Sequence, residues 1–207
     1  MEPLQCLFME LTAHSARYGD LGGQLWQEIA AGYTLPGRHY HNLDHLQNLI
    51  GELEPCKPLI DDYDVLLYAV FYHDLIYAAQ RQDNEEQSAE LAGNRLNALG
   101  LDPERIERCR QHILATKTHR AGADPDTLLL ADADLSILGA EEDRYDSYCR
   151  QIRQEYIVYP DVLYIPGRTK VLQHFLSMSH IYKTPHFHTL YEQQARLNLQ
   201  RELASLQ

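Results

Sequence analysis

The sequence predicts an all-α fold, a helical bundle, from three features of the 207-residue chain. Apolar residues recur three and four positions apart through most of its length, as on the buried face of an amphipathic helix. No stretch alternates apolar and polar residues as a half-buried strand does. Capping residues, glycines and prolines separate the apolar stretches, as expected where helices begin and end. A chain of this length can bury a full core without disulfides, so we expect one domain over residues 1–207.

Three helices are predicted in the first part of the chain. The apolar faces of the first two helices, on either side of Gly19–Asp20, consist of Leu4, Leu7, Phe8 and Leu11, and of Leu21, Leu25, Trp26 and Ile29. Pro36–Gly37 predicts a loop over residues 33–38. The apolar face of the third helix consists of Leu43, Leu46, Leu49, Ile50 and Leu53. Pro55 and Pro58 are expected to end that helix.

Two more helices are predicted in the middle of the chain. Asp61 or Asp62 can cap the first of them, because a side-chain oxygen at that position accepts hydrogen bonds from free amides of the first turn. We expect this helix to run to about Tyr77. The second begins at Asn84 and ends at Gly100, since glycine readily adopts the left-handed conformation that closes a helix.

The rest of the chain is also predicted to be helical. Asp102–Pro103 is a strong helix start, because an aspartate cap is followed by proline at the first helical position. Residues 117–126 are polar and predict a loop. The remaining helices are expected over residues 127–138, 141–159, 168–181 and 188–205, with Gly139, residues 160–167 and Pro185 between them.

Composition limits the partners that this chain is expected to have. The formal net charge of −12 disfavours a nucleic-acid polymer, because surfaces that bind one carry clustered lysine and arginine. A small phosphorylated molecule is compatible with this charge, since a divalent ion can invert the potential inside one pocket. The start of the chain lacks the features of a signal peptide, and no apolar run reaches membrane-spanning length. We therefore expect a cytoplasmic protein without membrane contact, and the oligomeric state stays open, a homo-oligomer included.

The most informative local feature is the adjacent pair His73–Asp74. It lies in the apolar stretch 65–77, where most neighbours are core residues. Burying a charged carboxylate costs on the order of several kcal/mol of free energy unless a cation or hydrogen-bond donors compensate the charge. A divalent ion bound by His73 and Asp74 would supply that compensation. A histidine and an aspartate that only hydrogen-bond within a helical core would need no ion, and this alternative stays open.

Further ligand candidates lie on both sides of this pair. His41 and His45 are four positions apart, which places them on one face of a helix. Downstream, Asp132 and Asp134 stand in another apolar run. One histidine, the His73–Asp74 pair and one distant aspartate give the mixed nitrogen and oxygen ligands that suit first-row divalent metals.

These residues resemble the HD superfamily of metal-dependent phosphohydrolases, which is named after an adjacent His-Asp pair. Tyr40-His41-Asn42 with His45 is similar to the Tyr-His-Asn-x-x-His segment of cyclic-nucleotide phosphodiesterases. Ala133-Asp134-Leu135-Ser136 is similar to their last metal-ligand segment. The resemblance covers roughly residues 39–139 and implies an HD-domain-like bundle, with a metal-site core over about residues 38–140 and helical extensions at both ends.

The resemblance implies a role for each of these residues. The metal ligands would be His45, His73, Asp74 and Asp134, and Asp132 would lie behind Asp134 or cap a helix. They would hold one or two divalent ions per chain, of Mn, Mg, Co, Ni, Fe or Zn, with Asp74 as the catalytic bridge if a second ion binds. His41 would be catalytic as the proton donor to the leaving oxygen, since imidazole titrates near neutral pH. The alternative for His41 is a further metal ligand.

Substrate contacts are expected from cations around this centre. Lys117 and His119 at a predicted helix end, Arg38 before the first histidine and Arg168 at the start of a predicted late helix are assigned to substrate binding. The positive charge of Arg168 and the free amides at the amino end of that helix could together bind an anion. Simple helix capping beside an exposed basic pair explains these residues equally well. His112 and His119 are alternative ligands for a second ion.

The resulting hypothesis is a phosphohydrolase that cleaves a phosphoester or phosphoanhydride bond in a small, nucleotide-like molecule. An ion at the centre would lower the pKa of bound water toward about 7 and supply the attacking hydroxide. The rival hypothesis is a binding module that retains the metal and senses a nucleotide without turnover. A helical scaffold with incidental histidines is the third hypothesis, and it predicts no stoichiometric metal.

Overall fold

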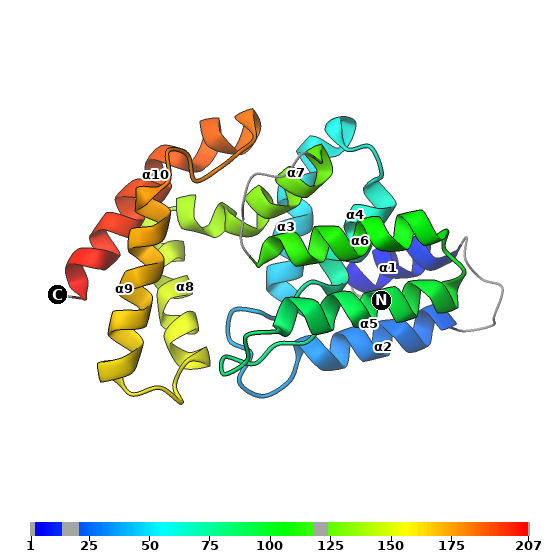
Figure 1. Ribbon diagram of the computed structural model, residues 1–207, viewed down its shortest axis with the longest axis horizontal. Helices are drawn as coiled ribbons and strands as arrows, with labels where there is room; N and C mark the ends of the chain where they lie inside the picture. The colour runs from blue at the N-terminus through cyan, green and yellow to red at the C-terminus, as the bar shows by residue number, and fades with distance from the viewer. Residues whose placement is uncertain (1–2, 14–20, 118–123, 207) are drawn as a thin grey trace.

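This computed structural model describes residues 3–13, 21–117 and 124–206, which contain ten α-helices and two 3₁₀ helices (Figure 1). No strand occurs in these residues, so the predicted all-α fold is confirmed. The helices are α1 (Pro3–Ala13), α2 (Leu21–Tyr33), α3 (Leu43–Leu53), η1 (Glu54–Leu59), α4 (Tyr63–Tyr72), α5 (Asn84–Leu99), α6 (Pro103–Thr116), α7 (Pro125–Asp134), η2 (Leu135–Gly139), α8 (Glu142–Glu155), α9 (Asp161–Ser177) and α10 (Pro185–Ser205). Within the described ranges, no helix combines the length and the apolar character that crossing a membrane requires.

Helix α4 is the central element of the first part of the chain. Its residues 65–72 are all buried, and the helix packs against α3, α5, α6 and α7. Phe71 of α4 packs edge-on against Phe8 of α1, with the ring centroids 5.0 Å apart. Trp26 of α2 lies edge-on against the same phenylalanine ring. The segment that carries His73 is therefore anchored in the core on several sides.

Helices α8, α9 and α10 form a second group, which stands beside the helices α1 to α6, with α7 between the two groups (Figure 1). α10 packs against α9, and both α8 and α10 contact η2. Asp132 of α7 fixes the start of α10, because its carboxylate accepts hydrogen bonds from the amides of Lys183 and Thr184 at 2.9 and 2.6 Å. Arg168 of α9 and Glu202 of α10 form an ion pair of 2.7 Å that is almost fully buried. The second group is thus tied to the first through the end of α7.

The local signals predicted several helix ends correctly. The carboxylate of Asp62 accepts a hydrogen bond from the amide of Val65 and caps α4. Gly100 ends α5 with a φ of 77°, a left-handed conformation that glycine adopts without strain. Asp102 caps α6 through the amide of Glu104, as the aspartate and proline pair predicted. These are the places where a single residue determines the backbone path.

The predicted end of α4 at Tyr77 is wrong, because the helix ends at Tyr72. The guanidinium of Arg38 donates hydrogen bonds to the carbonyl oxygens of Asp74 and Leu75, at 2.7 and 2.8 Å. In a continuous helix, the carbonyl of Asp74 would accept from the amide of Ala78, which instead donates to the side chain of Asn84. Arg38 therefore stabilises the turn that follows α4.

The predicted separator over residues 160–167 is also wrong, because α9 begins at Asp161. Pro160 precedes the first turn, and Pro166 lies within the helix, where it removes one backbone hydrogen bond without breaking the helix. Arg168 consequently lies well inside α9, and the predicted anion site at a helix amino end is wrong. α10 likewise begins at Pro185, three positions before the predicted start at residue 188, with the proline in its first turn.

Candidate metal centre

The ends of three helices bring the predicted ligands together. His45 lies in the first turn of α3, which Asn42 caps by accepting hydrogen bonds from the amides of Asp44 and His45. His73 caps the end of α4, and Asp74 follows in the turn. Asp134 is the last residue of α7. Although neighbouring residues on a helix point about 100° apart, an Asp74 oxygen lies 3.1 Å from His73 Nε2, so the two side chains reach the same point.

The separations between the candidate ligand atoms fit a single ion. His45 Nε2 lies 3.1 Å from His73 Nε2 and 3.3 Å from an Asp134 oxygen. An Asp74 oxygen lies 3.1 Å from His73 Nε2 and 3.8 Å from His45 Nε2. Metal bonds to such ligands are about 2.0–2.2 Å long, so two ligand atoms of one ion lie at most about 4.4 Å apart. His45, His73 and Asp74 form one group within this limit, and Asp134 is within it of both histidines, at 3.3 and 3.8 Å.

The orientation of His73 is fixed by the backbone. Its Nδ1 lies 2.9 Å from the carbonyl oxygen of Val70, which can only accept, so Nδ1 carries the proton and donates. In the neutral imidazole the lone pair then lies on Nε2, the atom that faces His45 and Asp74. A backbone carbonyl behind a histidine is a common way to orient a metal ligand.

Burial makes the charges of this cluster costly without compensation. His45 and His73 are 4% and 1% exposed. Burial lowers the pKa of His45, which favours the neutral imidazole that binds metals. Burial alone would also lower the pKa of His73, but the carboxylate of Asp74 raises that pKa to about 9. An ion would replace this proton as the positive charge between the carboxylates.

His41 lies beside the cluster but outside a helix. It precedes the Asn42 cap of α3, so the prediction that His41 and His45 share a helical face is wrong. Its Nε2 is 3.9 Å from the nearest Asp74 oxygen, and its Nδ1 is 2.6 Å from Glu155 Oε2. Burial would lower the pKa of His41, but Asp74 and the hydrogen bond with Glu155 raise it above the ordinary value of 6.5. The protonated imidazole is favoured, and its Nε2 points to the ligand side.

Glu155, at the end of α8, holds this histidine in place. Oε1 accepts hydrogen bonds from the amides of His39, Tyr40 and His41 at 2.8, 2.8 and 2.9 Å. Oε2 accepts from the hydroxyl of Tyr77 at 2.8 Å and pairs with His41. The Glu155 side chain is fully buried, and these donors lower its pKa from 4.5 to about 2, although burial alone would raise it. A carboxylate with this many donors stays ionised and orients the imidazole.

Glu155 is the functional residue that the sequence analysis missed. It lies 114 positions from His41, in an ordinary polar stretch of a helix, and no local pattern marks it. The partner could be sought only by asking which acidic residue compensates a predicted catalytic histidine, and the sequence contains many acidic residues. Its role becomes visible only when α8 is packed against the loop before α3.

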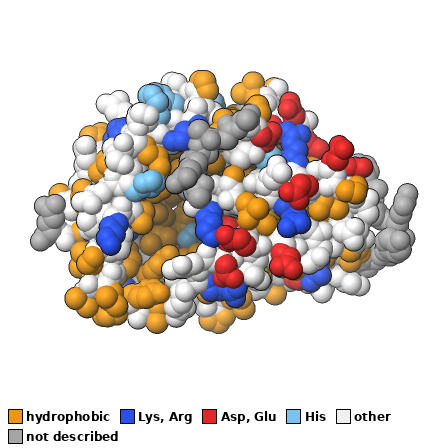
Figure 2. Space-filling view, in the orientation of Figure 1, with side chains coloured by type: hydrophobic (Ala, Val, Ile, Leu, Met, Phe, Trp, Pro, Cys, Tyr) orange, Lys and Arg blue, Asp and Glu red, His pale blue; other side chains and the backbone are white. Residues whose placement is uncertain are grey.

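A cavity of about 830 Å³ opens over this centre, with His41, Asp74 and Asp134 among the residues that line it. In Figure 2, a hollow lies between a largely hydrophobic surface on the side of α8 and α9 and a surface with mixed acidic and basic side chains on the side of α5 and α6. Cavities that bind small molecules in proteins have volumes of about 300–1,000 Å³. The volume and the lining fit a small organic ligand with a charged part.

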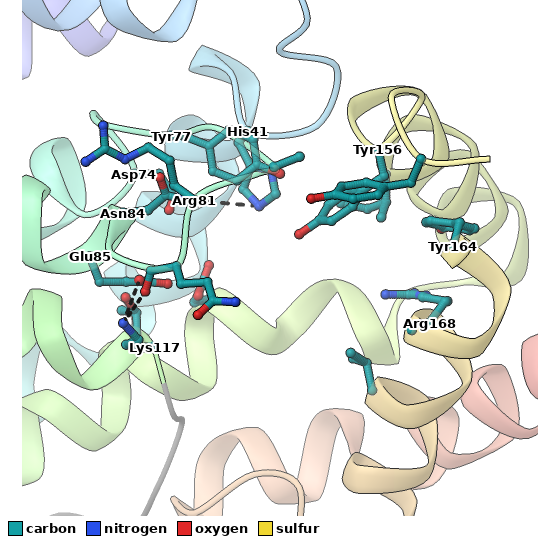
Figure 3. A pocket seen from close by; sticks show the side chains of 18 of the residues that line it. His41, Asp74, Tyr77, Arg81, Asn84, Glu85, Lys117, Tyr156, Tyr164 and Arg168 are labelled. Atoms are coloured by element: carbon teal, nitrogen blue, oxygen red, sulfur yellow. Dashed lines mark hydrogen bonds and ion pairs between the residues drawn. The ribbon is translucent and has the colours of Figure 1, made fainter. Parts of the chain in front are cut away.

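Tyrosines dominate one wall of this cavity. Those that line it on the side of α8 and α9 are Tyr148, Tyr156, Tyr159 and Tyr164. The ring centroids of Tyr156 and Tyr164 are 6.1 Å apart, as are those of Tyr156 and Tyr159. Figure 3 shows Tyr156 and Tyr164 opposite His41 and Asp74, across the open space. Such a wall can stack on a planar ring.

The predicted substrate-binding cations have contacts of their own. Lys117 lines the cavity, and its ammonium donates to the Gln82 carbonyl and to Glu86, both at 2.5 Å. Arg168 lines the opposite wall and is held by Glu202. Arg38 donates to backbone carbonyls around the centre and therefore positions the site segments. Their contacts with a substrate remain predictions, and His119 lies outside the described residues.

The structure separates the two aspartates of α7. Asp132 is 1% exposed and is engaged by the segment before α10, including the Thr184 hydroxyl at 2.7 Å. It therefore anchors this segment, and Thr184 is the residue at the cap position of α10. His112 is also buried, and its Nδ1 lies 2.7 Å from the hydroxyl of Thr127 at the start of α7, at the other end of that helix from Asp134. Neither residue is in the ligand group formed by His45, His73 and Asp74.

Comparisons with protein-family models, with curated proteins and with solved structures find no match. The arrangement of the side chains therefore carries the functional argument.

Proposed function

We propose that this protein is a metal-dependent phosphohydrolase of the HD type that cleaves a phosphoester or phosphoanhydride bond in a small, nucleotide-like substrate. The observation that carries the proposal is the convergence of His45, His73, Asp74 and Asp134 beside a histidine that Glu155 holds. The ligand set fits one divalent ion of Mn, Mg, Co, Ni, Fe or Zn, and the two oxygens of Asp74 allow it to bridge to a second ion. A divalent ion here supplies hydroxide at neutral pH and neutralises charge on the phosphoryl oxygens.

The chain itself supplies the proton for the leaving group. Cleavage of a phosphoester leaves an alkoxide, which is a poor leaving group unless an acid protonates it. The protonated form of His41 is favoured by Asp74 and Glu155, and its Nε2 lies on the side of the ligand cluster. Because Glu155 binds Nδ1, the imidazole keeps one orientation while Nε2 gives up its proton. A binding module without turnover would need no such donor, which favours the enzyme over the sensor.

The tyrosine wall supports a substrate with an aromatic ring. Tyr156 and Tyr164 face the cavity opposite His41 and Asp74, so a ring stacked there would place an attached phosphate toward the centre (Figure 3). Stacking on aromatic side chains tolerates different nucleobases, because every base has a π-face. Lys117 on the opposite side and Arg168 beside the tyrosines can then contact phosphate or sugar oxygens.

The test uses the purified full-length protein, stripped of metal and reloaded with Mn²⁺, Mg²⁺, Co²⁺ or Ni²⁺. Each form is incubated with a panel of nucleoside mono-, di- and triphosphates, cyclic nucleotides and non-nucleotide phosphate esters. We expect metal-dependent release of phosphate, or of a nucleoside phosphate, from at least one nucleotide, and loss of that release in Asp74→Asn. Nucleotide binding without turnover by any metal form would instead establish the sensor.

A further inference from the structure

A second group of metal-binding side chains lies on the surface, in the segment between α9 and α10 and in the first turns of α10. It consists of His180, His188 and Glu192, which can each place one ligand atom within 4.8 Å of the others. The two imidazoles meet directly, with His180 Nδ1 3.1 Å from His188 Nε2. His188 and Glu192 are four positions apart on α10, so they share one face of the helix. This surface cluster has no role in the function proposed above.

The separation of the two imidazole nitrogens fits a shared ion. With metal–nitrogen bonds of about 2.0–2.1 Å, two ligands of a tetrahedral ion lie about 3.3 Å apart, and two ligands at a right angle lie about 2.9 Å apart. The observed 3.1 Å falls between these values. Two neutral histidines gain only one weak hydrogen bond at this distance, whereas an ion would use both lone pairs.

The surface cluster is held in place before any ion binds. The Glu192 carboxylate accepts hydrogen bonds from the amides of Ile181 and Tyr182, at 2.9 and 3.1 Å, directly after His180. The hydroxyl of Tyr182 donates to the carbonyl of Leu135, and Asp132 binds the next two amides. The segment that carries His180 is thus fixed to α7, η2 and α10, and ligands fixed in this way lose little conformational entropy on binding.

The charges around the surface cluster limit how strongly it binds. Arg196 donates to Glu192 Oε1 at 2.8 Å, and the ammonium of Lys183 donates to the carbonyl of His180. Glu192 Oε1 also lies 3.2 Å from the amide of Ile181, and Oε2 accepts from the amides of Ile181 and Tyr182, so an ion must displace one of these donors to bind Glu192. His180 and His188 also line a hollow of about 760 Å³ together with His174 and Met178, so a remaining coordination position can face water or a small ligand.

We propose that His180, His188 and Glu192 form a second metal site, for a divalent ion of the class that prefers imidazole, with Zn²⁺ first. Two histidines and one glutamate with an open fourth position are a known ligand set for Zn²⁺. Copper and nickel ions also favour imidazole, whereas Mg²⁺ and Ca²⁺ prefer oxygen ligands and are not expected here. The site is independent of the buried centre, because it uses other helices and other residues.

The test measures Zn²⁺ stoichiometry and affinity in the full-length protein, by calorimetry after removal of all metal with a chelator. Four proteins are compared: wild type, His188→Gln, His180→Gln and the matched control His186→Gln. His186 lies in the same turn of α10 and packs on Phe187, outside the cluster. Both cluster histidines reach the surface, so glutamine at either position leaves the core unchanged.

We expect His188→Gln and His180→Gln each to bind one equivalent of Zn²⁺ fewer than wild type and His186→Gln, or to bind it at least about tenfold more weakly. Circular dichroism should show the same helix content in all four proteins. Equal stoichiometry and affinity in all four proteins would overturn the proposal. Any Zn²⁺ bound at the buried centre is present in all four proteins, so the difference in Zn²⁺ stoichiometry between them reports the surface cluster alone.

Discussion

The buried cluster and the surface cluster contain the same kinds of ligand, yet their surroundings differ. At the buried centre, His45 and His73 are almost inaccessible, and the carboxylates of Asp74 and Asp134 lie directly beside them. At the surface cluster, Glu192 already has Arg196 as a counter-ion, and both histidines reach the solvent. Buried carboxylates are destabilising unless a cation compensates them, so ion binding at the buried centre would relieve an electrostatic cost. At the exposed cluster that cost is already small, and an ion would gain only its bonds to the ligands.

A second difference concerns what stands beside each cluster. The buried centre adjoins His41 and its fixed partner Glu155, at one end of a cavity with an aromatic wall. The surface cluster lies on an open hollow lined by a loop and parts of α9 and α10. Of the two clusters, only the buried centre therefore combines candidate metal ligands with a fixed histidine and a tyrosine-lined cavity, which is why the catalytic proposal concerns that centre. Each of the following experiments tests a part of this contrast.

The largest expected effect comes from Asp74→Asn. This substitution removes one negative ligand and the carboxylate closest to His73, so we expect the loss of bound metal at the buried centre. Turnover should fall by about 10³-fold or more, since metal ions contribute several kcal/mol of charge stabilisation in the transition state. His188→Gln should retain wild-type turnover. Metal analysis and initial rates of both variants check this, and equal losses in the two would remove the contrast between the clusters.

His41→Gln is expected to have the next largest effect. Loss of a general acid lowers turnover by about 10²–10³-fold, and glutamine cannot deliver a proton. The metal content should remain at the wild-type level, because Glu155 holds His41 Nδ1 and the proposed function uses His41 as the proton donor and not as a ligand. Initial rates and elemental analysis are measured on the same preparation. If the metal disappears with the activity, His41 is a ligand, which is the alternative that the sequence left open.

The candidate ligands of the buried centre illustrate what local sequence can suggest. His73–Asp74 stands out because a charged pair interrupts a long apolar stretch, and His45 and Asp134 follow from short matching segments. Helix ends with a capping residue, such as Asp62 and Asp102, are equally local. These features depend on neighbours within a few positions, so the sequence is sufficient to find them.

Features that depend on packing between distant segments were missed or misplaced. Glu155 acquires its role from the loop before α3, and the end of α4 depends on a guanidinium from residue 38. Arg168 follows Pro166, which favours a helix start there, but α9 begins at Asp161, where Arg153 of α8 pairs with the Asp161 carboxylate at 2.7 Å. Tertiary contacts set each of these, and no periodicity along the chain encodes them.

Glu155→Gln should reveal how much stability the carboxylate that orients His41 contributes at the buried centre. The pKa of Glu155 is about 2 in the folded protein and 4.5 ordinarily, so the unfolded chain takes up a proton more readily between these pH values. Its stabilisation is therefore present above pH 4.5 and is lost as the pH falls toward 2. The shift corresponds to about 3 kcal/mol.

The measurement is the free energy of unfolding of wild type and Glu155→Gln, obtained from urea titrations at several pH values between 7 and about 3. Glutamine keeps an oxygen for the backbone amides but cannot accept from His41 and Tyr77 in the same way. Wild type should lose stability on acidification more steeply than the variant, and the two curves should approach each other at low pH. His188→Gln, the control from the surface cluster, should follow the wild-type curve. Parallel curves for wild type and Glu155→Gln would show that this carboxylate is not held as the structure indicates.

The smallest expected effect concerns the aromatic wall, which distinguishes the cavity of the buried centre from the open hollow of the surface cluster. Tyr156→Leu keeps an apolar side chain but removes the ring that faces the cavity (Figure 3). Stacking of one base on an aromatic ring contributes about 1 kcal/mol or more, so we expect KM for a nucleotide to rise about fivefold with kcat nearly unchanged. KM for a phosphate ester without a ring should stay the same, because such a substrate gains nothing from stacking.

The comparison of the two KM values separates recognition of the ring from a general disturbance of the site. A rise for both substrates would mean that Tyr156 supports the shape of the cavity, and the nucleotide-like substrate would lose its main structural support.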